Sequence, residues 1–190
     1  MQKIKTSHYD ILFSNQNSSF INDIISKNKY SKVFILVDSN TKKYCLKLFL
    51  KKHLSEIKIQ LITIKNGEEN KNTKSLHSIW IKISKLGGDR NSLLINLGGG
   101  MISDLGGFVA STYNRGIDFI NIPTTLLSMV DASIGGKVGI NIEKLKNMVG
   151  VFNYPKLILI DTSFLQTLPK RELKSGFGEM LKHGLIFDKK

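Results

Sequence analysis

Short apolar runs rich in β-branched residues alternate along the chain with stretches whose apolar residues recur every three or four positions. The short runs predict buried strands, and the wider spacing predicts amphipathic helices. Strands are predicted over residues 33–37, 57–64, 92–97, 117–122 and 157–161. This alternation is typical of an α/β fold, here a Rossmann-like, doubly wound parallel sheet with helices on both faces.

The helices between these strands end where glycine or polar residues interrupt the pattern. One helix is predicted over residues 41–54, and another over residues 101–111 in spite of Gly106 and Gly107. A third begins at Asn72 and carries apolar residues at helical spacing, namely Leu76, Ile79, Trp80, Ile83 and Leu86. A last helix over residues 171–183 has no strand after it. We therefore expect residues 1–167 to form the α/β domain and residues 168–190 to begin another.

Composition indicates a globular protein in the cytoplasm. A chain of 190 residues can bury one sizeable core, and 41% of its residues are hydrophobic. No apolar stretch approaches the roughly 20 residues that span a bilayer, and the first residues lack the apolar core of a signal peptide. With a single cysteine, Cys45, an internal disulfide is excluded, and its apolar neighbours favour a core position.

The formal net charge of +13 raises the question of nucleic-acid binding. The cations are nearly all lysines, however, and they are scattered through the first ninety residues without an aromatic-rich platform for bases. Abundant Lys, Asn and Ile together indicate an AT-rich coding bias. We interpret the charge as a solvated surface and expect neither a nucleic-acid nor a membrane partner.

A strand, three glycines and a helix follow one another at residues 92–111, an order that suits phosphate binding at a helix amino terminus. The match to the dinucleotide fingerprint is imperfect, because Ser103 stands where that pattern has Gly or Ala. Taken alone, the segment is equally consistent with a tight turn that binds no ligand.

Two further patterns suggest a polar site. Arg115, Lys137 and Lys146 stand beside glycine and asparagine outside amphipathic helices, which favours a pocket for a multiply anionic ligand over solvated surface charge. Glu179 and His183 are four residues apart on a predicted helix, a spacing that can bind a metal but is also common by chance.

Seven segments together resemble the 3-dehydroquinate synthase family of sugar phosphate cyclases: residues 98–108, 115–119, 122–131, 135–141, 146–148, 168–169 and 178–184. The resemblance is dense from about Asn66 to Gly184 and looser before it. It implies an enzyme that uses NAD and a divalent metal, zinc or cobalt, to convert 3-deoxy-D-arabino-heptulosonate 7-phosphate into 3-dehydroquinate and phosphate. This is a phosphate-eliminating carbon–oxygen lyase of the shikimate pathway for aromatic amino-acid biosynthesis.

The resemblance also implies residue roles. Cofactor contacts are expected from Asn66, Gly67, Glu68, Lys71, Gly100, Met101, Ile102, Ser103, Asp104, Thr124, Thr125, Lys137, Lys146, Phe164, Leu165, Gln166 and Thr167. Substrate contacts are expected from Arg115, Lys137, Lys146, Asn147 and Lys182. Catalytic roles fall to Lys137, Lys182, Asp131 and Asn147, and Glu179 corresponds to a metal ligand.

The chain departs from the family pattern in two ways. Asn66 replaces the usual Asp, which removes a charge from the expected ribose contact. The family's other metal ligands are two histidines of an all-helical carboxy-terminal domain for metal and substrate, and the sequence ends before them. We therefore expect the chain to be an inactive piece that binds NAD weakly. We also expect an exposed apolar face on its last helix, formed by Leu173, Phe177, Met180, Leu181 and Leu185.

Other interpretations stay open from the sequence. A sibling cyclase, or a polyol dehydrogenase of similar architecture, would share the nucleotide-binding pattern, but Gly136-Lys137 and Lys146-Asn147 favour a phosphorylated acidic substrate. A non-catalytic nucleotide-binding remnant is the alternative outside enzymes. The expected partner is a small phosphorylated keto acid, and a homodimer is left open.

Overall fold

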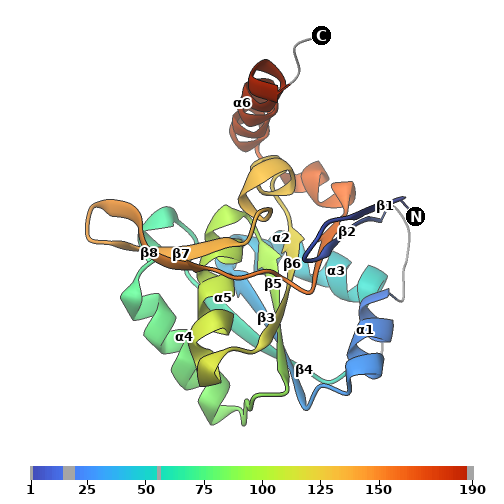
Figure 1. The fold of residues 1–190 in the computed structure, drawn as a ribbon, viewed down its shortest axis with the longest axis vertical. Helices are drawn as coiled ribbons and strands as arrows, with labels where there is room; N and C mark the ends of the chain where they lie inside the picture. Colours follow the sequence, from blue (N-terminus) through green and yellow to red (C-terminus); the bar gives the residue numbers. More distant parts are fainter. Residues whose placement is uncertain (1, 15–19, 55–56, 188–190) are drawn as a thin grey trace.

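A seven-stranded, mostly parallel sheet forms the centre of the protein in the computed structural model, which describes residues 2–14, 20–54 and 57–187 (Figure 1). The strand order is β1-β2-β9-β6-β5-β3-β4. Its strands are β1 (Gln2–Lys5), β2 (Asp10–Phe13), β3 (Lys32–Asp38), β4 (Ile59–Ile64), β5 (Ser92–Gly98), β6 (Asp118–Pro123) and β9 (Leu157–Ile160). The predicted fold class is confirmed.

The amino-terminal edge of the sheet was not predicted. Strand β2 runs parallel to β9, whereas β1 pairs antiparallel with β2 and closes the edge. All four residues of β1 are exposed, and two of them are lysines, so the segment has no apolar alternation to reveal a strand. Edge strands with charged side chains are common, because the charge discourages pairing with other chains.

Helices cover both faces of the sheet. Helices α1 (Phe20–Asn28), α2 (Ser39–Tyr44) and α3 (Leu46–His53) lie on one face, and α4 (Thr73–Lys85) and α5 (Gly100–Thr112) on the other. Strand β3 shows why: Val33, Ile35 and Val37 pack in the first core, and Phe34 and Leu36 in the second. Burial on both faces makes the parallel strands continuously apolar.

The helix predicted over residues 41–54 is two helices that meet at Cys45, where φ is −113°. The buried residues Thr41, Cys45, Phe49 and His53 recur every four positions. In a straight helix residues four apart are rotated by about 40°, so this stripe would turn away from the sheet. The bend at Cys45 is consistent with keeping both ends of the stripe against the core.

A second two-stranded sheet, β7 (Lys137–Ile142) and β8 (Leu145–Phe152), packs against α5 outside the central sheet. This hairpin was not predicted, and it explains the two glycines within α5. A Cβ on Gly106 would lie 1.9 Å from the side-chain oxygen of Asn96 in β5, and one on Gly107 would lie 2.3 Å from Val138 in β7. Helix α5 is thus held closely between the sheet and the hairpin.

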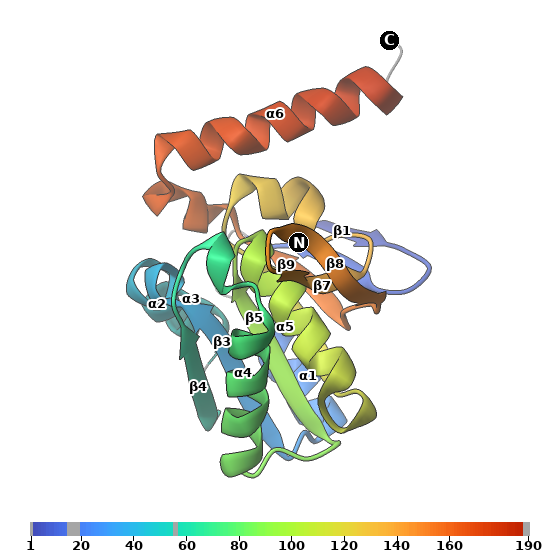
Figure 2. The same ribbon diagram turned by 90° about the vertical axis from the view of Figure 1, so that its left-hand side faces the viewer.

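Helix α6 (Lys170–Phe187) leaves the domain and crosses above it (Figure 2). It touches the body at Gly176, where a Cβ would lie 2.5 Å from Leu126. Beyond that point Phe177, Met180, Leu181 and Leu185 are between 44% and 75% exposed, as predicted. Leu173 is half-buried instead, because it lies in the turn before the contact. Within the described part of the chain, no helix combines the length and apolarity needed to cross a membrane.

Candidate functional site

The polar residues of interest gather at the carboxyl ends of the parallel strands. Strand β3 has β4 on one side and β5 on the other, so the chain reverses its direction of travel across the sheet between β3 and β5. Ligands of open α/β sheets bind at such a switch point. Asp38 at the end of β3 caps α2, and Ser39 donates a 2.7 Å hydrogen bond to the Oδ1 of Asn66, which follows β4.

The amino terminus of α5 lies at this switch point. Gly99 is its N-cap residue and supplies no side-chain hydrogen bond. Ideal Cβ atoms on Gly99 and Gly100 would each lie 3.0 Å from a neighbour, Thr125 and Ala132 respectively. The side chains of Ile102 and Ser103 are buried, so these residues can meet a ligand only through the backbone. The first turn of α5 therefore offers main-chain donors and a positive helix end.

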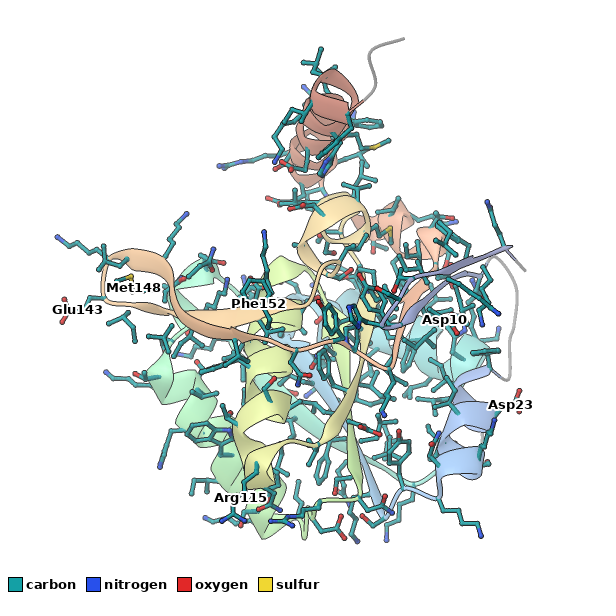
Figure 3. The ribbon with its side chains drawn as sticks, in the orientation of Figure 1. Asp10, Asp23, Arg115, Glu143, Met148 and Phe152 are labelled. Carbon is teal, nitrogen blue, oxygen red and sulfur yellow. The ribbon has the colours of Figure 1, made fainter. Side chains whose placement is uncertain are left out.

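A cavity of about 570 Å³ opens beside this turn, between the first residues of α5, the loop 131–137 and the β7–β8 hairpin. Four residues that were predicted to act on cofactor or substrate line it: Asp104, Asp131, Lys137 and Asn147. The hairpin adds an apolar wall that includes Met148 and Phe152, both labelled in Figure 3. Polar groups and an apolar wall around one cleft are typical of a small-molecule site.

Lys71 lies behind two of the lining residues and joins the loop after β4, helix α5 and the hairpin. Its side chain is 3% exposed, and its ammonium group lies 2.5 Å from Asp104, 3.9 Å from Glu68 and in contact with the side-chain oxygen of Asn147. Burial raises the pKa of Asp104, and the charge of Lys71 opposes that rise. The cation thus offsets a carboxylate that would otherwise be costly to bury.

A second group of donors lies where α6 crosses the π-helix η3 (Ser128–Ala132). One donor atom each of Asp131, Glu179 and His183 lies within 4.8 Å of the others, with Nε2 of His183 3.5 Å from both carboxylates. Lys182 contacts Glu179, and that hydrogen bond raises the pKa of Lys182. The spacing of Glu179 and His183 suggested this pair, but nothing in the sequence placed Asp131 beside it.

Other predicted residues lie elsewhere. Arg115 follows the carboxyl end of α5, a helix about 20 Å long, so it stands at the opposite end of the domain from the cavity (Figure 3). The structure does not bring Arg115 to the site within one chain. Phe164 is 1% exposed in the core, which leaves Leu165, Gln166 and Thr167 of the 3-10 helix η4 (Thr162–Thr167) for contact with a ligand. Lys146 is exposed on the hairpin, and Thr124 is buried at the end of β6.

One buried ionic cluster lies outside the residues that the sequence predicted for the site. Asp161, fully buried, accepts hydrogen bonds from Lys52 at 2.7 Å and from Ser163, and lies 2.9 Å from Nε2 of His53. Burial raises the pKa of this carboxyl, but the hydrogen bonds from His53, Lys52 and Ser163 outweigh it and hold the pKa well below its ordinary value. The cluster fixes the start of η4 to the end of α3. No motif signals it, since its members are over a hundred positions apart.

Comparison with known proteins agrees with this architecture. The sequence model for the amino-terminal domain of 3-dehydroquinate synthase matches residues 61–175. The chain belongs to the 3-dehydroquinate synthase family. The 3-dehydroquinate synthase of Parabacteroides distasonis is 47% identical over 184 residues, which are 95% of this chain and 51% of that protein. The chain thus spans about half the length of the curated 3-dehydroquinate synthases that it matches.

Solved structures of sugar phosphate cyclases share the fold. 2-epi-5-epi-Valiolone synthase from Streptomyces hygroscopicus, solved with NAD⁺ and Zn²⁺ bound, has a TM-score of 0.78 and 29% identity, and the match covers 96% of this chain and 51% of that one. 2-Deoxy-scyllo-inosose synthase, solved with carbaglucose-6-phosphate, NAD⁺ and Co²⁺, has a TM-score of 0.80 and 24% identity, covering 95% of this chain and 50% of that one. The 3-dehydroquinate synthase family and these cyclases therefore have a common α/β domain.

Proposed function

We propose that the chain is the nucleotide-binding half of a 3-dehydroquinate synthase, which converts 3-deoxy-D-arabino-heptulosonate 7-phosphate into 3-dehydroquinate and phosphate. One observation carries the proposal: Asp104 of α5, Asp131 and Lys137 of the following loop and Asn147 of the hairpin line one cavity next to the amino terminus of α5. The reaction is proposed from membership of the family, and the cavity that these four residues line is the proposed site.

The residues present fit NAD. The uncapped first turn of α5 suits a pyrophosphate, and Gly99 and Gly100 carry no side chain that would cover its backbone N–H groups. Ser39 and Asn66, joined by a hydrogen bond, lie at the next strand ends, where an adenosine ribose would be held. When bound, NAD supplies a hydride acceptor that is regenerated in each turnover. The protein's own part is to fix that cofactor against the substrate.

The cavity fits an anionic substrate. Lys137 and Asn147 both line it, and Lys137 is exposed, so a cation and an amide face the same space. Ammonium groups bind phosphate and carboxylate by charge-assisted hydrogen bonds. Lys146, next to Asn147 on the hairpin, adds a second cation at the rim. A simple polyol would leave these charges without a counter-charge.

The residues near α6 fit a divalent metal. Glu179 would hold the ion together with the two histidines expected from the carboxy-terminal domain, and within this chain Asp131 and His183 offer two further donors within 4.8 Å, although His183 is not a ligand in the family pattern. When bound, such an ion supplies Lewis-acid polarisation of a substrate hydroxyl. Lys182 now neutralises Glu179, so its ammonium group would have to move aside and could then meet the substrate phosphate. The same residues thus account for the predicted roles of Glu179 and Lys182.

The test separates the half chain from a complete enzyme. The 190-residue chain should bind NAD⁺ weakly and release no phosphate from the heptulosonate phosphate, even with added Zn²⁺ or Co²⁺. A fusion with the carboxy-terminal half of the Parabacteroides distasonis protein should release phosphate, and Glu179→Gln in that fusion should abolish release while NAD⁺ binding persists. A fusion that binds NAD⁺ but oxidises glycerol instead would contradict the proposal, as would robust turnover by the 190-residue chain alone.

A further inference from the structure

The loop that carries Lys137 into the cavity begins with two glycines in the left-handed region. Gly135 has φ of +89° and Gly136 has φ of +70°, a conformation that other residues rarely adopt. A Cβ on Gly136 would also lie 2.7 Å from the ring of Tyr154. The backbone of the loop is therefore restricted to one conformation. The orientation of the Lys137 side chain depends on the contacts that hold this loop in position.

The β1–β2 hairpin at the amino terminus holds the loop of Gly135 and Gly136 in position. The hydroxyl oxygen of Tyr9, in the turn between β1 and β2, accepts a 2.9 Å hydrogen bond from the backbone N–H of Gly135. On the other side, the N–H of Asn153 donates to the carbonyl of Gly136 at 2.8 Å. The two glycines are thus fixed at both ends, once by the hairpin at the edge of the sheet (Figure 1) and once by the segment after β8.

Hydrogen bonds within the β1–β2 turn and contacts with the ring of Tyr154 fix the position of Tyr9. The Thr6 hydroxyl accepts hydrogen bonds from the N–H groups of His8 and Tyr9 and donates to the carbonyl of Tyr9, which fixes the turn. The rings of His8 and Tyr154 stack 4.1 Å apart, and the ring of Tyr9 lies 5.9 Å from that of Tyr154. Tyr9 is 8% exposed, so its ring has little freedom to turn away from Gly135.

We propose that Tyr9 is a positioning residue that orients Lys137 for anion binding through its hydrogen bond to Gly135. The proposal rests on the proposed function, since it takes Lys137 as one of the cations that bind the anionic groups of the substrate. It assigns a purpose to the β1–β2 hairpin, which lies outside residues 61–175 matched by the family model and lines no part of the cavity.

The test uses the 190-residue chain and inorganic phosphate, with the dissociation constant followed by the amide chemical shifts of residues 135–139. Tyr9→Phe keeps the ring and removes only the hydroxyl. It should weaken phosphate binding about fivefold, the effect of one neutral hydrogen bond. Tyr113→Phe is the matched control, because it removes a tyrosine hydrogen bond to the carbonyl of Gly88, at the far end of α5. Phosphate affinity should be unchanged in that control.

A double-mutant cycle shows whether Tyr9 acts through Lys137. Lys137→Gln should itself weaken phosphate binding, and adding Tyr9→Phe to it should then have no further effect. His8→Ala, at an exposed position, should also weaken binding, because it removes the stack on Tyr154.

Three outcomes would overturn the inference. If Lys137→Gln weakens binding and Tyr9→Phe does not, Tyr9 has no positioning role, although the anion site stands. If Tyr9→Phe weakens binding equally in the Lys137→Gln background, its effect is a general loosening of the fold. If Lys137→Gln leaves phosphate affinity unchanged, the anion site of the proposed function fails, and the inference fails with it.

Discussion

The ammonium nitrogen of Lys71 lies 2.5 Å from the Oδ2 of Asp104, and the same nitrogen contacts the side-chain oxygen of Asn147. One buried cation therefore joins the loop after β4, the amino-terminal half of α5 and the hairpin, which are three of the segments around the candidate site. Lys71 is predicted from the family resemblance as a cofactor contact, and the structure gives it a role in charge compensation as well.

Replacing Lys71 by Met should leave Asp104 buried without its counter-charge. We expect a loss of about 3 kcal/mol in the free energy of unfolding at pH 7, measured by urea denaturation. Lys65→Met, at an exposed position on the same loop, serves as the control and should change stability by less than about 0.5 kcal/mol. Equal stability of the two variants would show that Lys71 does not compensate Asp104.

Asp104 should also matter for cofactor binding. Asp104→Asn keeps the shape of the side chain but removes its charge, so NAD⁺ affinity measured by calorimetry should fall at least about tenfold if the carboxylate accepts a hydrogen bond from the cofactor. Asp118→Asn at the start of β6, where the carboxylate bonds Tyr30, is the control. Unchanged NAD⁺ affinity in Asp104→Asn would remove this residue from the cofactor site.

Acid should destabilise the protein through Asp161. The pKa of this carboxyl is lowered in the folded state, so it contributes stability above its ordinary pKa of 3.8 that is lost progressively as pH falls below that value. Asp161→Asn should cost about 3 kcal/mol at pH 7, because it removes the negative charge that Lys52 and His53 share. Its unfolding free energy should also fall less steeply between about pH 5 and pH 2.

The surface pair Lys3–Asp10 supplies the control for that experiment, with a 2.6 Å separation and both side chains 37% exposed. Asp10→Asn should cost less than about 1 kcal/mol. If Asp161→Asn and Asp10→Asn show the same stability and the same pH profile, the buried cluster contributes no more to the free energy of unfolding than the surface pair does.

Metal binding can be followed by the visible absorption of Co²⁺. Asp131→Asn, Glu179→Gln and His183→Ala should each weaken Co²⁺ binding by at least about tenfold relative to the unaltered chain. His77→Ala, which removes an exposed histidine of α4, should not. If only Glu179→Gln has an effect, Asp131 and His183 are neighbours of the site and not ligands.

The exposed face of α6 should cause self-association of the 190-residue chain. Leu181 and Leu185 are 64% and 75% exposed, so replacing both by Gln should shift the chain toward monomer in light scattering without lowering the thermal midpoint. Leu145→Gln is the comparison, because Leu145 is 57% exposed on the hairpin. Restored monomer in that variant alone would place the adhesive surface on the hairpin.

The parallel part of the fold was predictable because strands buried on both faces leave continuous apolar runs such as residues 33–37 and 92–97. The hairpin β7–β8 was not, since every residue of β8 is exposed and alternation is therefore lost. The break at Cys45 was also missed, because it involves neither glycine nor proline. In both cases the local structure depends on which other part of the fold packs against the segment, and the local sequence does not show this.

The candidate site was likewise predictable only in part. Motifs identified Asp104, Lys137 and Asn147, which share a cavity as a common site requires. Motifs could not place Arg115, which lies at the far end of α5, or reveal that Asp131 stands beside Glu179 and His183. They were silent on Tyr9 and Asp161, whose partners are more than a hundred positions away. Such contacts depend on how the chain folds back on itself, which local spacing does not record.

The packing of α5 has a consequence for how the sequence can drift. Codons for glycine begin with two guanines, so a coding bias toward adenine and thymine, as the wealth of Lys, Asn and Ile suggests, acts against glycine at every position. Gly106 and Gly107 nevertheless stand together in a helix interior, where a methyl group on either would overlap Asn96 or Val138. A larger residue at either position would require α5 to move away from the sheet or from the hairpin, so the separation of these three elements itself limits which amino acids the two positions can hold.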